Sequence, residues 1–116
     1  MQGQDPNGDL GGLVISNEVL AAIAVTAARD VGGVSAVVPR VPELARLRNL
    51  RWENQRYVKL SGEGGEVTVE LWLRVRAGIK LTTVAGGVQR AVKDALQGMT
   101  GKIVTRVNIK ILGIDF

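Results

Sequence analysis

Residues 67–76, VTVELWLRVR, carry the pattern that decides the fold of this chain. Every second position is aliphatic, and the positions between hold threonine, glutamate, tryptophan and arginine. Successive side chains of a β-strand point to opposite faces of a sheet, so this alternation predicts a strand with one buried face and one solvated face. The solvated face would display Trp72, Arg74 and Arg76.

Two amphipathic helices are predicted, one on each side of this strand along the sequence. The first follows Ser16, a favourable N-cap residue, and has Glu18 in its first turn, where the helix dipole favours negative charge. Gly32 and Gly33 end it. The second helix is expected over about residues 80–98. Apolar residues four apart predict the buried stripe of the first helix, which is Val19, Ile23, Ala27 and Val31 with Leu20 and Ala24 beside it.

Further strands are predicted on both sides of the two helices. GGLVI at residues 11–15 is typical of a brief strand, and GVSAVV at 33–38 and YVKL at 57–60 are also typical of strands. The ending KIVTRVNIKILGIDF, residues 102–116, alternates again. Its alternation predicts one face with Ile103, Thr105, Val107, Ile109 and Ile111, and another with Val104, Arg106, Asn108, Lys110 and Leu112.

The resulting order is strand, helix, strand, strand, strand, helix, strand. It predicts an α+β class domain close to a split β-α-β-β-α-β arrangement in two layers. Two helices would pack on one face of a mainly antiparallel sheet and leave the other face to solvent. Residues 1–10 are expected to form a flexible N-terminal tail, and residues 11–116 a single domain.

The composition lacks the residue types that most enzymes use for catalysis. The 116 residues include neither cysteine nor histidine, so the commonest nucleophile, acid–base group and metal ligands are missing. The carboxylates are scattered and form no recognisable acid–base pair or metal cluster. We therefore expect no catalytic site, no cofactor and no metal. Neither a membrane-spanning apolar run nor a secretory signal is present in the sequence, which predicts a cytoplasmic protein.

The net charge of +4 is concentrated in one segment, residues 40–59, which holds six basic and two acidic residues. Arg48, Arg51 and Trp52 are its candidate binding residues. One interpretation is that the segment binds an acidic surface, such as anionic lipid headgroups or RNA. The other is that it is a solvated connection whose leucines pack against the edge of the core. Residues 43–54 fit a short helix or a loop equally well.

The solvated sheet face is the second candidate site. Trp72, Arg74 and Arg76 would lie beside basic residues of the last strand if the two strands share the sheet. Such a face has three interpretations: a protein contact, since tryptophan, tyrosine and arginine are enriched at binding hot spots; a single-stranded RNA platform; or a soluble face covered by long side chains. The remaining residues assigned to it are Tyr57, Arg106 and Lys110.

Several motifs together resemble the alkaline shock protein family of envelope stress proteins. They are the entry Ile15-Ser16, the turn Gly32-Gly33-Val34, Val88-Gln89, Met99-Thr100-Gly101, and Val107-Asn108 followed by alternating apolar residues to Phe116. The resemblance covers residues 11–116. The basic segment departs from it, because relatives usually have a short glycine-rich connection there.

This resemblance implies a non-enzymatic bacterial stress-response protein that contributes to cell-envelope homeostasis. It implies self-association, and association with the inner side of the membrane through a partner that spans it. The leading hypothesis is thus an interaction or scaffold module that binds copies of itself or an envelope protein, with no small-molecule substrate. The alternative is nucleic-acid (RNA) binding on the same basic sheet face.

Overall fold

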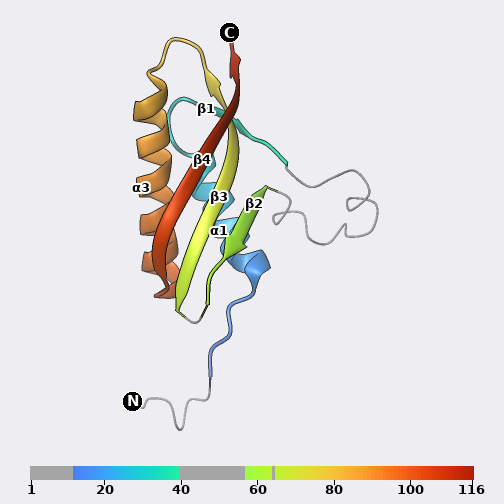
Figure 1. Ribbon diagram of the computed structural model, residues 1–116, viewed down its shortest axis with the longest axis vertical. Helices are drawn as coiled ribbons and strands as arrows, with labels where there is room; N and C mark the ends of the chain where they lie inside the picture. Colours follow the sequence, from blue (N-terminus) through green and yellow to red (C-terminus); the bar gives the residue numbers. More distant parts are fainter. Residues whose placement is uncertain (1–11, 40–56, 64) are drawn as a thin grey trace, which may run out of the picture.

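A computed structural model describes three parts of the chain: residues 12–39, 57–63 and 65–116 (Figure 1). The candidate residues Arg48, Arg51 and Trp52 lie outside them. A binding role for the basic segment, a helix or loop at 43–54 and a flexible tail at 1–10 therefore stay predictions.

The alternating stretch forms β3, Glu66–Arg76, the central strand of the sheet. Every second side chain of β3 is buried, from Val67 to Val75, and the side chains between them are half-exposed or exposed. The predicted strand with one buried and one solvated face is confirmed. All other strands in the described residues pair with β3.

Two short strands share one edge of β3. β1, Val34–Val37, pairs with residues 73–75 and β2, Val58–Ser61, pairs with residues 68–71. Both pairings are antiparallel, so the two strands lie end to end along the same side of β3.

The other edge of β3 is occupied by β4, Ile103–Asp115, which runs parallel to it. The crossover between these two strands is α3, Leu81–Thr100. Two of the three pairings are antiparallel. In Figure 1, α1 lies behind the sheet and α3 lies along its left side, next to β4. The predicted α+β fold, with two helices on one face of a mainly antiparallel sheet, is confirmed.

The first helix, α1, spans Asn17–Arg29 and begins where the sequence predicts. The Ser16 hydroxyl oxygen accepts a hydrogen bond from the Val19 backbone N–H at 3.3 Å, which satisfies one of the unpaired donors of the first turn. α1 packs beside α3, and the core fills the space between both helices and the sheet. The largest fully buried side chains include Val25, Leu71, Leu73, Val88 and Leu96.

Two predictions for the N-terminal part need correction. Residues 12–16 form neither helix nor strand, and Leu13 and Val14 are 83% and 93% exposed. The predicted stripe of α1 is right only in part, because Ile23, Ala27 and Val31 pack partly buried against the core whereas Val19 is 48% exposed. The fully buried side of the helix consists of Leu20, Ala21, Ala24, Val25 and Ala28.

The predicted faces of the last strand are wrong at its start. Val104 is buried, whereas Ile103 is 59% exposed. The cause is a register shift between Val104 and Arg106, where one extra residue is inserted opposite β3. A bulge of this kind exchanges the two faces, and beyond it Val107, Ile109 and Ile111 face the helices as predicted.

Candidate interaction surface on the open sheet face

The face of the sheet opposite the helices is covered by no helix or strand of the described residues. In this open face, Trp72 of β3 lies beside Lys110 of β4, and Thr68 lies beside Arg106. The structure thus brings five of the predicted residues onto two neighbouring strands. These are Trp72, Arg74 and Arg76 from β3 and Arg106 and Lys110 from β4.

The cation at the centre of the open face contacts two groups. The Lys110 ammonium lies 3.1 Å from a Glu70 carboxylate oxygen and 5.8 Å from the centre of the Trp72 ring. A cation over an indole ring is attracted by the ring's negative face. The positive charge of Lys110 is therefore partly neutralised by Glu70, and the Trp72 indole already has a cation beside it.

A second ion pair lies nearer the C-terminal end of β3. The Arg74 guanidinium donates two hydrogen bonds to Oδ1 of Asp115, at 2.7 and 3.0 Å. The Ser35 hydroxyl donates to Oδ2, so the carboxylate links β1, β3 and β4. These contacts, led by the hydrogen bond from Arg74, hold the pKa of Asp115 below its ordinary value, and the same pair raises the pKa of Arg74.

Glycine at position 113 permits this geometry. Gly113 lies opposite Arg74 in the parallel register. A Cβ atom at this position would collide with the guanidinium of Arg74, so any side chain would displace the arginine from its present position. Sequence reasoning missed Asp115, Ser35 and Gly113, because their roles depend on a register that alternation alone does not specify.

The structure places Tyr57 apart from Trp72. The Tyr57 ring packs against the core edge, and the Arg29 guanidinium of α1 lies 5.4 Å from its centre. It therefore contacts the helical layer, unlike the five residues on β3 and β4. Alternation over residues 57–60 suggested a place on the open face, but Tyr57 lies in a bend just before β2 begins at Val58.

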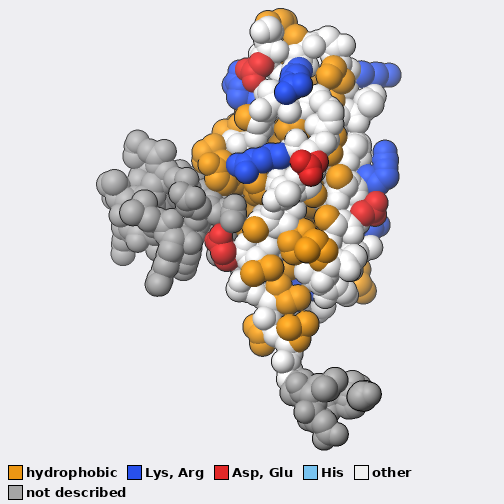
Figure 2. Space-filling model, turned by 180° about the vertical axis from the view of Figure 1, so that it is seen from behind, with side chains coloured by type: hydrophobic (Ala, Val, Ile, Leu, Met, Phe, Trp, Pro, Cys, Tyr) orange, Lys and Arg blue, Asp and Glu red, His pale blue; other side chains and the backbone are white. Residues whose placement is uncertain are grey.

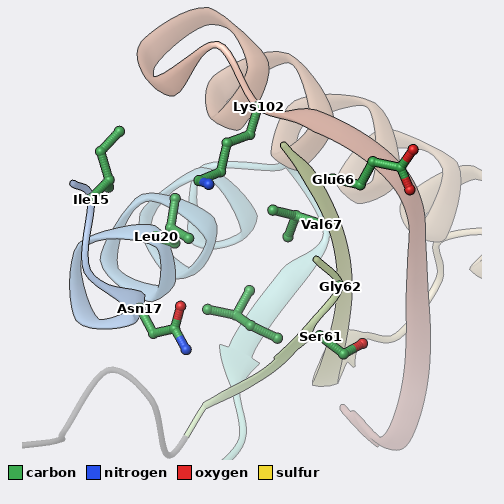
Figure 3. A pocket seen from close by; sticks show the side chains of 9 residues that line it. Ile15, Asn17, Leu20, Ser61, Gly62, Glu66, Val67 and Lys102 are labelled. Atoms are coloured by element: carbon green, nitrogen blue, oxygen red, sulfur yellow. The ribbon is translucent and has the colours of Figure 1, made fainter. Parts of the chain in front are cut away.

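A small hollow lies between the start of α1 and the adjoining ends of β2 and β3 (Figure 3). Its volume is about 130 Å³, below the roughly 300–1,000 Å³ typical of small-molecule sites. Lys102 extends into this space toward Leu20, whereas the Glu66 carboxylate points away from it (Figure 3). In the described part of the chain, no group of three acidic residues could hold a metal ion.

Comparison with known proteins gives consistent matches over nearly the whole chain. Residues 5–116 match the model of the alkaline shock protein family, described as having a cell envelope-related function. The uncharacterized protein YloU of Bacillus subtilis (strain 168) is 31% identical over 110 residues, which cover 90% of this chain and 88% of that protein. YqhY of the same organism is 29% identical over 107 residues, 92% of this chain and 79% of that protein.

Solved structures share the fold at low sequence identity. Two variants of the MamM CTD superpose with TM-scores of 0.51 and 0.53, at 17% and 15% identity. The matches cover 83% and 84% of this chain and 95% and 98% of those chains. This likeness concerns the fold alone. Among the described residues, no helix is long and apolar enough to cross a membrane.

Proposed function

Because this chain belongs to the alkaline shock protein family, whose function is cell envelope-related, we propose that it is a non-enzymatic interaction module that binds a protein partner of the envelope. The binding surface would be the open sheet face, centred on Trp72. The module would act at the inner side of the membrane, held there by a partner that spans it.

The observation that carries this proposal is a half-exposed tryptophan on an uncovered face, beside charges that are already paired. Trp72 lies with Lys110, and Lys110 is paired with Glu70. Tryptophan and arginine are the residues most enriched at binding hot spots. Contacts made before binding hold these side chains in place, which lowers the entropic cost of ordering them against a partner.

The same pairing argues against RNA. A strand of RNA needs unpaired cations for its phosphates and open aromatic faces for its bases. On this face, Asp115 accepts both hydrogen bonds of the Arg74 pair and Glu70 neutralises Lys110, so two of the four cations assigned to it are already paired with carboxylates. A protein partner with mixed charge fits better than a polyanion.

The test is membrane retention of the full chain in the bacterium that makes it. Trp72→Ala and Arg106→Ala, combined in one variant, remove an aromatic anchor and a cation and keep all four residues of the two ion pairs, although Lys110 loses the ring beside it. We expect the wild type in the membrane fraction and the variant released from it. Lys93→Ala, on the exposed side of α3, is the matched control and should behave as the wild type does.

Treatment of the isolated membranes distinguishes the alternatives. Protease acting on membrane proteins should release the wild type, whereas ribonuclease should not. Release by ribonuclease, together with binding that weakens steeply with salt, would instead indicate RNA. Equal retention of the double variant and the wild type would overturn the assignment to this face.

A further inference from the structure

The outward side of α1 is apolar, although neither the core nor the sheet covers it. α1 reads NEVLAAIAVTAAR and is apolar around most of its circumference, a composition typical of a helix buried on all sides. Yet Val19 is 48% exposed on it, and Met99 on the neighbouring α3 is 71% exposed. This side of the helical layer thus exposes apolar side chains to solvent beside residues that pack partly against the core.

A groove of about 420 Å³ runs between the two helices on this side. Figure 2 shows hydrophobic side chains gathered over this part of the helical layer and continuing toward the segment before α1. The groove is lined mainly by small and aliphatic residues, which let another helix approach closely. They include Ala22, Ile23, Thr26 and Ala27 from α1 and Ala95 and Met99 from α3.

The charged residues of α1 indicate which helix is complementary to this groove. Glu18 lies five residues before Ile23, and Arg29 lies five residues after Ala24. The two charged residues are eleven positions apart, about three turns, so they lie along the same side of the helix, beside the groove and not in its lining. Glu18 is half-buried there, and the Arg29 guanidinium lies over the Tyr57 ring. A second α1 packed antiparallel, with its midpoint at Ile23 and Ala24, would place its Arg29 opposite Glu18 and its Glu18 opposite Arg29.

The ends of the helix fit the same arrangement. Asp30 caps the C-terminus of α1 and lines the groove. In an antiparallel pair it would lie near the N-terminus of the other α1, where the helix dipole favours a carboxylate. Charge complementarity that is symmetric about the middle of one helix is the signature of a two-fold contact, in which the same patch meets itself.

We propose that two copies of this chain associate through antiparallel contact of their α1 helices, with Ala22, Ile23 and Thr26 at the centre and Glu18–Arg29 pairs at the rim. The contact uses the helical layer and leaves the open sheet face of each copy uncovered. The proposal therefore stands independently of the function assigned to that face.

A charge-reversal experiment tests this contact. Glu18→Arg gives a chain with two positive rim charges, and Arg29→Glu gives a chain with two negative ones. Each variant alone should dimerise about tenfold more weakly than the wild type, because both rim pairs become repulsive. An equimolar mixture of the two variants should restore association, since both pairs are then attractive.

Sedimentation velocity of the full chain at low ionic strength gives the dissociation constants. Lys93→Glu, on another side of α3, reverses one charge without reaching the contact and should dimerise as the wild type does. A monomeric wild type at all accessible concentrations, undiminished dimers of the single variants, or a mixture that stays monomeric would each overturn the proposal. Far-ultraviolet circular dichroism of each variant verifies that it is folded.

Discussion

At the scale of single residues, the open face is organised by two carboxylates that reach across strands. Glu70 holds Lys110 beside the Trp72 ring, and Asp115 holds Arg74 over Gly113. Two cations of this face are thus held at defined positions, Lys110 beside the indole and Arg74 over Gly113. A partner would meet a pre-formed pattern of aromatic and charged groups.

The Asp115 carboxylate makes stability depend on pH. Its pKa in the folded protein is lower than its ordinary value of 3.8, so folding is favoured whenever the carboxylate is charged. This contribution is complete above about pH 4 and is lost as pH falls through the folded-state pKa. We expect Asp115→Asn to unfold at a lower temperature than the wild type near neutral pH.

Thermal denaturation at a series of pH values measures this effect. The difference in unfolding temperature between Asp115→Asn and the wild type should narrow below pH 4, because the wild type then loses the same charge. Arg74→Ala should show the same narrowing. A difference that widens below pH 4 would contradict a folded-state pKa of Asp115 below its ordinary value.

At the scale of elements, the strongest periodic patterns were predicted well. β3 and α1 begin and end within two residues of the expected positions, because a ten-residue alternation and a capped apolar stretch each specify one local structure. For the first residues of β4, the prediction of which side chains face the helices was wrong. A bulge depends on pairing with β3, and nothing in the local sequence of β4 marks the inserted residue.

The candidate site was predicted only in part, for the same reason. Alternation placed Trp72 and Arg74 on the solvated face, and the parallel pairing brought Arg106 and Lys110 beside them. Their carboxylate partners could not be found, since Asp115 is 41 residues from Arg74 along the chain. Residues 12–15 fit a strand by composition, yet none of the described strands pairs with them.

The N-cap of α1 gives a prediction at this scale. Ser16→Ala removes the hydroxyl that accepts from Val19 N–H and should lower the free energy of unfolding by about 1 kcal/mol. Urea denaturation followed by circular dichroism measures the change. Ser61→Ala, at the exposed end of β2, is the matched control and should stay within about 0.5 kcal/mol of the wild type. Equal values for the two variants would show that the cap is dispensable.

At the scale of the whole molecule, the two layers present opposite surfaces to solvent. The sheet carries Trp72 and its ion pairs on one side, and the helices carry the apolar groove on the other. If both proposed contacts form, a pair of chains joined through α1 has one open sheet face at each end. Such a pair could bind two partner molecules in the same membrane.

Two-point attachment would strengthen binding without any new contact at Trp72. We expect Arg29→Glu to leave membranes about tenfold more readily than the wild type, although its sheet face is unchanged. Co-sedimentation with isolated membranes over a range of protein concentrations measures this. Adding the Glu18→Arg chain should restore retention. Unchanged retention of Arg29→Glu would mean that each chain binds its partner singly.

The hydrogen bond between Ser35 and Asp115 joins residues 80 positions apart, and β4 pairs with β3 although the whole of α3 lies between them in the sequence. Such distant pairings must close long loops before they contribute stability, so folding should take on the order of milliseconds to seconds, not microseconds. Stopped-flow refolding from urea measures this time. During synthesis on the ribosome, β3 is made well before β4. Until β4 emerges, one edge of β3 stays unpaired, which makes the nascent chain a client for chaperones that bind extended apolar segments.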